Sequence, residues 1–291
     1  MKVLVTGGTG FVGSHVVRAI QDAGHDVRAL VRKSSVPGAE RAEGDMTDSD
    51  SLRRAVQGVD AVVHLVAIRQ GREDQFQRVM VDGTRDLLAA TREAGVARFV
   101  QMSALGTSEE SKDLVPYYRA KWLQEGLVRE SGLEHVIFRP SFVFGRDGGI
   151  LPTFRTLAKV APVTPIVGSG KQRIQPIWVD DVAKYFVKAL GKPEAANRTF
   201  ELGGPDVVTW NELWSRLKRA LGVRRPSMHV PMAFMRVNAL VTERLPGDIP
   251  LTRDLLKMLE HGDNVVTNTD AVETFGLPLV PLDEQLRRVA S

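Results

Sequence analysis

Cysteine is absent from this 291-residue chain. Disulfides, thiolate metal sites and cysteine nucleophiles are therefore excluded. Long apolar runs are absent as well, since none reaches the roughly 18 residues that a membrane-spanning helix requires. No signal-peptide pattern precedes the first apolar segment, at residues 2–6. We expect a cytoplasmic protein without a membrane span.

The chain also has no large excess of positive or negative charge. The chain has 39 Lys and Arg against 35 Asp and Glu, a net charge of +4 that is spread along the sequence. No basic stretch interleaved with aromatic residues indicates a nucleic-acid partner, and the acids and the six histidines show no metal-ligand spacing. The length and the ordinary hydrophobic content predict a globular protein with one large domain or two unequal ones.

The apolar segment at residues 2–6 leads into a glycine-rich turn, and apolar residues then recur at helical spacing up to Gly24. Glycines in such a strand-turn-helix unit let a diphosphate approach the N–H groups at the positive end of the helix. The turn fits both G-x-G-x-x-G and T-G-x-x-G-x-x-G. It predicts dinucleotide binding, although a glycine turn can also serve only tight packing. The expected contacts are Gly7, Gly8, Thr9, Gly10, Phe11, Val12 and Gly13.

A basic pair, Arg32 and Lys33, follows the second predicted strand, at residues 26–31. A carboxylate here would bind the adenosine ribose of NAD, whereas Arg accommodates the 2′-phosphate of NADP. The pair therefore favours NADP(H), with NAD(H) left open if these side chains are only solvated. Asp45 and Met46 lie where an acid could meet the adenine amino group; the alternative is a turn Asp followed by a buried Met.

Strands and helices alternate over the first half of the chain. Predicted strands at residues 60–67, 98–102 and 134–138 are separated by predicted helices at 73–94 and 116–131. This succession predicts an α/β fold with a doubly wound parallel sheet, the Rossmann arrangement, whose ligands bind at the carboxyl ends of the strands. Further cofactor contacts are expected from the residues at those ends, Val66, Ala67 and Pro140.

After Pro140 the pattern changes to Gly- and Pro-rich segments with scattered helices. We expect residues 1–140, with 177–203, to form the dinucleotide-binding core. Residues 141–176 and 204–291 are expected to form a smaller substrate or lid lobe. One helix in it, from Thr209, has the spacing of a capping box with Glu212.

The candidate catalytic residues are Ser103, Tyr117 and Lys121. Tyr117 and Lys121 are four residues apart, which places them on one face of a helix, and Ser103 ends the preceding strand. A Tyr beside an ammonium can move a proton near neutral pH. We expect Tyr117 to be the general acid or base and Lys121 to lower its pKa and hold the nicotinamide ribose. Ser103 would then hydrogen-bond the substrate oxygen. A Tyr–Lys pair is otherwise common on helix surfaces; its place after a strand of a dinucleotide-binding sheet favours catalysis.

With these residues the chain resembles the short-chain dehydrogenase/reductase superfamily, in its extended or atypical, NAD-dependent epimerase/dehydratase-like branch, over nearly its full length. The resemblance rests on Thr6–Gly13, His64–Ala67, Val81–Thr84, Tyr117–Lys121, Arg139–Gly145 and Trp178–Ala183. It implies that the Arg-Pro strand end borders the nicotinamide. It also implies that two copies of the chain pair through the helices at 73–94 and 116–131. The expected assembly is a homodimer, or the chain is a subunit of a larger complex.

Two residues depart from the family pattern. Relatives often have an Asn that builds a proton relay just before Val-x-Gly-Thr, where this chain has Met80, and Phe144 replaces the Tyr of sugar-nucleotide epimerases. Ser103–Gly106 and Gln175–Val179 look most like the NAD(P)H-binding accessory subunit of respiratory complex I and its bacterial relatives. Three functions stay open: an oxidoreductase acting on an unidentified carbonyl or alcohol, a non-catalytic NAD(P)H-binding subunit or redox sensor, and a sugar-nucleotide epimerase or dehydratase.

Overall fold

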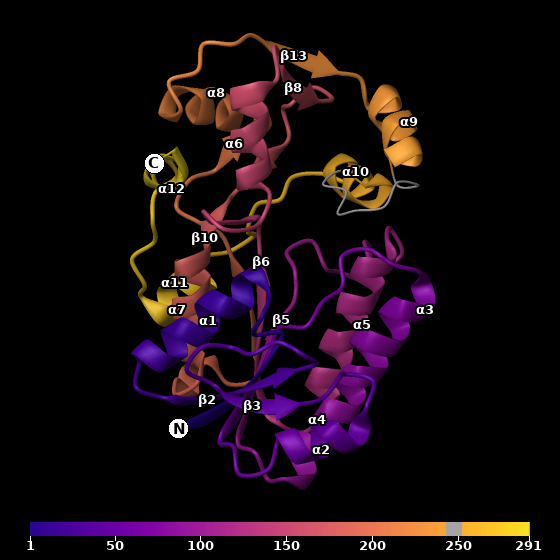
Figure 1. The fold of residues 1–291 in the computed structure, drawn as a ribbon, viewed down its shortest axis with the longest axis vertical. Helices are drawn as coiled ribbons and strands as arrows, with labels where there is room; N and C mark the ends of the chain where they lie inside the picture. The colour runs from indigo at the N-terminus through magenta and orange to yellow at the C-terminus, as the bar shows by residue number, and fades with distance from the viewer. Residues whose placement is uncertain (243–251, 291) are drawn as a thin grey trace. The chain divides into compact units, whose positions relative to one another are not determined.

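The computed structural model describes residues 1–242 and 252–290. The chain divides into two compact units (Figure 1). The first comprises Met1–Pro140, Val179–Leu202 and Thr267–Pro278, and the second comprises Ser141–Trp178, Gly203–Val266 and Leu279–Ser291.

The first unit is built on a seven-stranded parallel sheet of order β11-β6-β5-β4-β1-β2-β3. Its strands are β1 (Lys2–Thr6), β2 (Asp26–Val31), β3 (Glu40–Glu43), β4 (Ala61–His64), β5 (Arg98–Met102), β6 (Glu134–Pro140) and β11 (Arg198–Leu202). The chain runs outward from β1 through β2 to β3 and then returns to β4 on the other side, so the strand order reverses between β1 and β4. The predicted doubly wound fold is confirmed, and this reversal is where such sheets bind ligands.

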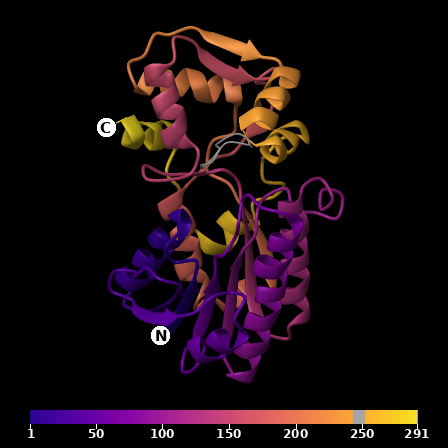
Figure 2. The same cartoon turned by 45° about the vertical axis from the view of Figure 1, so that its right-hand side comes forward.

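Helices cover both faces of this sheet, as both views show (Figure 1, Figure 2). One face carries α1 (Phe11–Asp22) packed on α7 (Val179–Ala189). The other carries α2 (Ser49–Ala55), α4 (Gly83–Glu93) and α5 (Pro116–Glu130). Because both faces are covered, β4 is buried along its whole length. Two short elements, η2 (Pro193–Ala195) and α11 (Asp270–Phe275), complete the unit.

The single helix predicted over residues 73–94 is divided in the structure. A short α3 (Glu73–Gln75) leads into the π-helix η1 (Phe76–Asp82), and regular α-helix resumes with α4. Apolar spacing could not reveal this, because a π-turn adds only one residue to a turn. Such π-segments are frequent at functional sites.

The second unit contains three two-stranded sheets and five helices among its described residues. The strand pairs are β7 (Val143–Phe144) with β10 (Ile177–Trp178), β9 (Arg173–Ile174) with β12 (Val208–Thr209), and β8 (Thr164–Val167) with β13 (Ser227–Val230). The helices are α6 (Leu151–Val160), α8 (Trp210–Ala220), α9 (Met232–Thr242), α10 (Arg253–Glu260) and α12 (Leu282–Ala290). The predicted capping box at the start of α8 is present, with Thr209 and Glu212 bonding reciprocally.

Across residues 1–242 and 252–290, no helix is long and apolar enough to cross a membrane. The cytoplasmic location stays a prediction.

Candidate nucleotide-binding and active site

The glycine turn after β1 is so tight that Gly7 and Gly13 leave no room for a side chain. Gly7 has a φ of +78°, and a Cβ there would lie 3.0 Å from the backbone carbon of Leu65 and the nitrogen of Val66. A Cβ on Gly13 would lie only 2.0 Å from the carbonyl oxygen of Gly7. The amide of Gly10 donates to that same oxygen at 3.0 Å. The first turn of α1 is therefore pressed directly onto the loop, which in turn abuts the end of β4.

The N-terminus of α1 has no side chain that caps it. Gly10 is the N-cap residue and offers no side-chain acceptor, and the first turn carries no acid. Phe11 and Val12 lie in this first turn, and Thr9 is exposed just before it. The leading N–H groups and the positive helix end are thus left for an external anion. This cradle, whose close backbone contacts leave no room for a Cβ at Gly7 or Gly13, fits the diphosphate of a dinucleotide.

The basic pair lies at the end of β2 and is open to solvent. The side chain of Arg32 is 81% exposed, and its Nε lies 3.7 Å from Oδ2 of Asp45. Lys33 is exposed as well. Burial raises the pKa of the Asp45 carboxyl, but hydrogen bonds from Thr47 and the charge of Arg32 outweigh it and hold that pKa below its usual value. Arg32 is therefore free to turn toward a phosphate, with a carboxylate already beside it.

Asp45 and Met46 have clear structural roles in the loop after β3. The N–H and hydroxyl of Thr47 donate to Oδ1 of Asp45 at 2.9 and 2.7 Å, which forms an Asx turn. Met46 is buried in the core, and a Cβ on Gly83 would lie 2.5 Å from its carbonyl oxygen. The glycine of the Val-Asp-Gly-Thr motif is thus needed for close packing of α4 on this loop. The adenine contact of both residues stays a prediction.

A buried polar chain connects β1 and β4 to α4. The hydroxyl of Thr84 donates its one proton to the carbonyl of Met80 at 2.5 Å, so Nε2 of His64, 3.0 Å away, must donate to Thr84. Nδ1 of His64 then accepts from Thr6 at 2.7 Å. Burial, helped by the charge of Lys121, lowers the pKa of His64 to about 3, so the imidazole is neutral. This series of hydrogen bonds explains why Thr84 follows Gly83 in the Val-Asp-Gly-Thr motif.

We expect this buried His64 to make stability depend on pH. In the unfolded chain its pKa is near 6.5, so between about pH 6.5 and 3 the unfolded state binds more protons than the folded state. The free energy of unfolding therefore falls as the pH drops through this window, by up to roughly 4 kcal/mol. Urea unfolding of the wild type and of His64→Gln from pH 7 to pH 4 measures it. The advantage of the wild type over the variant should shrink on acidification, and a constant difference would contradict the assignment.

Met80, at the position where relatives have the relay Asn, is fully buried in η1. Its side chain belongs to an apolar cluster with Phe76, Val81 and Ala120, against which the ring of Tyr117 packs. Its carbonyl accepts from Thr84 and also from Nε2 of Gln124, at 3.0 Å. The carbonyl of Met80 is thus used inside the protein.

The structure brings Tyr117 and Lys121 together on α5. Nζ of Lys121 lies 5.9 Å from the centroid of the Tyr117 ring and donates to the carbonyl of Met102, at the end of β5, at 2.8 Å. Burial lowers the pKa of Lys121 to about 7, while the charge of Glu125 opposes this fall. Burial raises the pKa of the half-buried Tyr117, against the lowering that the sequence analysis expected from Lys121. A phenol that keeps its proton suits a proton donor, the role that a carbonyl reduction requires.

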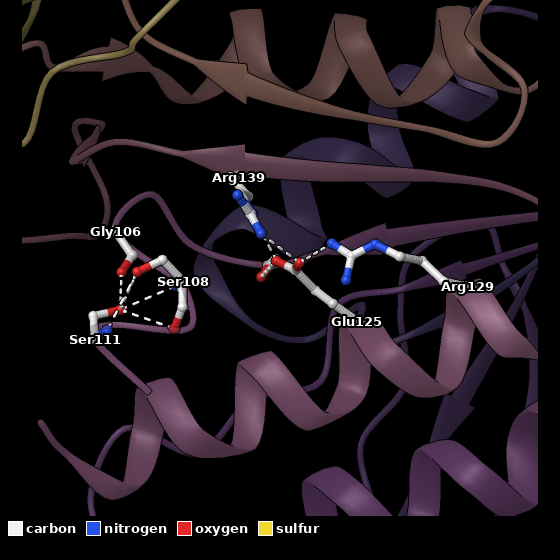
Figure 3. Close-up of polar contacts among 7 residues, drawn as sticks. Gly106, Ser108, Ser111, Glu125, Arg129 and Arg139 are labelled. Atoms are coloured by element: carbon white, nitrogen blue, oxygen red, sulfur yellow. Dashed lines mark hydrogen bonds and ion pairs between the residues drawn. The ribbon is translucent and has the colours of Figure 1, made fainter. Parts of the chain in front are cut away.

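Ser103 is held by a group that the sequence analysis missed. Its hydroxyl is buried and donates to Oε1 of Glu125 at 2.5 Å. Glu125 is fully buried and also accepts from Nε and Nη2 of Arg139, at 2.8 and 2.7 Å, and from Arg129 (Figure 3). Because the Ser103 proton is given to Glu125, the hydroxyl can offer only lone pairs to a second partner. Its contact with substrate stays a prediction.

The remaining predicted residues lie at strand ends of the same sheet. Val66 is half-buried and Ala67 exposed, just beyond β4. Pro140 ends β6, and its carbonyl accepts from the N–H of Leu105 at 2.9 Å. The site residues assigned to the first unit therefore follow the carboxyl ends of β1, β2, β3, β4, β5 and β6 or lie on α5 beside them.

Comparisons with known proteins place the chain in a family whose members use NAD, in line with the glycine cradle. Residues 3–203 match the NAD dependent epimerase/dehydratase family. The mitochondrial NADH dehydrogenase [ubiquinone] 1 alpha subcomplex subunit 9 of Mus musculus is 30% identical, over 98% of this chain and 79% of its own length. The 2-alkyl-3-oxoalkanoate reductase of Stenotrophomonas maltophilia is 28% identical, over 99% and 98%.

Among solved structures, a short-chain dehydrogenase/reductase superfamily protein from Agrobacterium tumefaciens with bound NAD superposes with a TM-score of 0.76. It is 24% identical, and the match covers 100% of this chain and 96% of that one. This likeness shows the fold. The family match spans more than half of the chain and includes the glycine cradle, Tyr117 and Lys121. The chain belongs to the NAD dependent epimerase/dehydratase family.

Proposed function

We propose that the chain is an NADPH-dependent reductase of a carbonyl substrate. The observation that carries this proposal is the pairing of Tyr117 with Lys121 on α5, where burial keeps the phenol protonated. A reductase that matches nearly the full length of the chain supports it. The name of that relative makes 3-oxo acids the first substrates to test.

In this mechanism each residue has one task. When bound, the reduced nicotinamide supplies a hydride for the carbonyl carbon. The glycine cradle and the N-terminus of α1 hold the diphosphate. The Tyr117 hydroxyl gives its proton to the carbonyl oxygen, and the Lys121 ammonium favours the phenolate that remains. Ser103, locked on Glu125, presents lone pairs that accept a hydrogen bond from the alcohol product.

Replacing Tyr117 with Phe removes the proton donor and keeps the ring in its apolar cluster. For any carbonyl compound that the protein reduces, we expect kcat to fall by a factor of about 100 or more. The Kd for NADPH should change by less than about threefold. Oxidation of NADPH, followed at the absorbance of the reduced nicotinamide with a panel of 3-oxo acids, ketones and aldehydes, measures kcat. Calorimetry measures Kd. Unchanged turnover would overturn the catalytic assignment.

Arg32 sets the proposed preference for NADP(H) over NAD(H). Arg32→Ala removes the guanidinium that would pair with the 2′-phosphate and leaves Asp45 beside the ribose. We expect the NADPH Kd to rise about 10- to 100-fold, the scale of one charge-assisted pair, while the NADH Kd changes little. Lys171→Ala, which removes an exposed cation from the second unit, is the control. An equal loss for both cofactors would contradict this role.

A second candidate function is a non-catalytic NAD(P)H-binding subunit of a larger assembly. Two observations favour it. The carbonyl of Met80 already accepts hydrogen bonds from Thr84 and Gln124, and the hydroxyl of Ser103 already donates its proton to Glu125, so both groups are engaged within the protein. The relationship to a subunit of NADH dehydrogenase is in line with it. NADPH binding with no turnover of any compound on the panel would favour this function over reduction.

A further inference from the structure

Acidic residues are missing from two long segments of the chain. Residues 148–179 and 213–242 hold ten Lys and Arg and not one Asp or Glu, although the whole chain has 35 acids. The near balance of charge therefore hides an uneven distribution. The expectation of an evenly spread excess was wrong for this part of the sequence.

The fold of the second unit joins these two segments. Strand β8 of the first pairs with β13 of the second, and the N–H of Thr164 donates to the carbonyl of Pro226 at 2.9 Å. Arg225 donates to the carbonyl of Ala161, just after α6, at 2.7 Å. Lys218, near the end of α8, donates to the carbonyl of Arg225 at 3.0 Å. The C-terminal ends of α6 and α8 and the β8–β13 ribbon thus form one continuous region (Figure 1).

Three cations of this region project into solvent. Lys159 lies in the last turn of α6, Arg219 in the last turn of α8 and Arg224 in the loop before β13, and all three are exposed. None of them forms an ion pair with any acid of residues 1–242 or 252–290. By contrast, Arg216 and Arg236, in the same acid-free segments, pair with Asp206 and Glu260.

Large apolar side chains are exposed in the same two acid-free segments, and β13 leads within two residues into α9, which carries Phe234. Val160 is 73% exposed, Met228 55%, and Phe234 and Val237 63% each. On β13, Ser227 and His229 bond to Lys218 and Asn211 of α8, so Met228, between them, points to the opposite face of the ribbon. Half of the large apolar side chains that the described structure leaves exposed therefore lie in the two acid-free segments.

We propose that this region binds the surface of anionic phospholipid membranes. Its membrane-facing residues, here called the basic apolar patch, are Lys159, Val160, Arg224, Met228 and Phe234. Unpaired cations attract anionic headgroups, and isolated apolar side chains enter the interface between headgroups and acyl chains. A nucleic acid would favour stacked aromatic rings, but Trp210 and Trp214 of α8 are buried. Apolar side chains that project singly from separate elements suit the interface of a bilayer, which needs no partner surface of matching shape.

Vesicle flotation of the full chain tests the proposal. We expect the protein to float with vesicles of phosphatidylcholine and phosphatidylglycerol at 7:3 in 0.1 M salt, and to stay unbound with pure phosphatidylcholine. The variant Lys159→Glu/Arg224→Glu should bind at least 25-fold more weakly, because each cation near a charged surface contributes about fivefold. The control is Arg18→Glu/Arg92→Glu, which makes the same change of net charge at exposed positions in the first unit and should bind like the wild type.

A third variant tests the apolar part of the patch. Phe234→Ser should weaken binding to the mixed vesicles several-fold, and emission from Phe234→Trp should shift to shorter wavelength when they are added. Equal binding by the two charge-reversal variants would overturn the proposal, since net charge alone would then explain it. Failure of the wild type to float would overturn it too, as would binding only to heparin or single-stranded DNA. None of these measurements depends on turnover, so the proposed reductase can fail while this inference stands.

Discussion

Gly13→Ala should abolish detectable binding of both NADPH and NADH, with a loss of at least about 100-fold in affinity. The new Cβ would lie 2.0 Å from the carbonyl oxygen of Gly7, a backbone atom that no side-chain rotation can move away. The first turn of α1 must therefore shift away from the loop, and the N–H groups that form the cradle move with it. Overpacking of this kind also costs about 1–3 kcal/mol of stability.

The chain offers a matched control for this change. A Cβ on Gly126, within α5, would meet nothing within 4 Å. Gly126→Ala should therefore leave cofactor binding unchanged and raise stability by about 0.5–1 kcal/mol, through helix propensity and a less flexible unfolded chain. Calorimetric titration with both cofactors and thermal unfolding measure the two effects. If Gly13→Ala binds like the wild type, the cradle is not the diphosphate site.

The cradle could be predicted from sequence because its signal is local. The whole unit of strand, turn and helix lies within the first 24 residues, and the glycine spacing follows directly from the backbone geometry. The parallel sheet could be predicted for a similar reason. Continuous apolar strands alternate with amphipathic helices, and a right-handed crossover leaves little choice of topology. The pairing of Tyr117 with Lys121 needs only the helical repeat.

What the sequence analysis missed depends on contacts between distant segments. Glu125 gathers Ser103 from the end of β5 and Arg139 from β6, and nothing in the apolar pattern shows that a charged residue of α5 is buried. A signal was present in the spacing, since Glu125 lies one helical turn after Lys121, on the face of α5 that carries Tyr117 and Lys121. The two-residue strands of the second unit, such as β9 and β12, are too short to show any period at all.

Glu125→Gln should destabilise the first unit by about 3 kcal/mol. The buried carboxylate accepts two hydrogen bonds from Arg139, one from Arg129 and one from Ser103. An amide keeps the volume but removes the charge and turns one acceptor into a donor, so the guanidinium of Arg139, 17% exposed, loses its counter-ion. Breaking a buried pair costs about 3–5 kcal/mol. The lower value applies here, because Arg129 is 38% exposed and can be solvated.

The same substitution should also change the titration of Lys121. Burial lowers the pKa of this ammonium to about 7 and the charge of Glu125 opposes the fall. Without that charge the pKa drops further, so Lys121 loses its proton at a lower pH than in the wild type. Thermal unfolding measures the stability, and NMR of 13Cε-labelled lysine follows the titration directly. Glu130→Gln, at the exposed end of the same helix, removes the same charge and should change neither. If Glu125→Gln leaves the Lys121 titration where it is in the wild type, Glu125 does not help to hold the ammonium charged, and the buried carboxylate serves the packing of α5 alone.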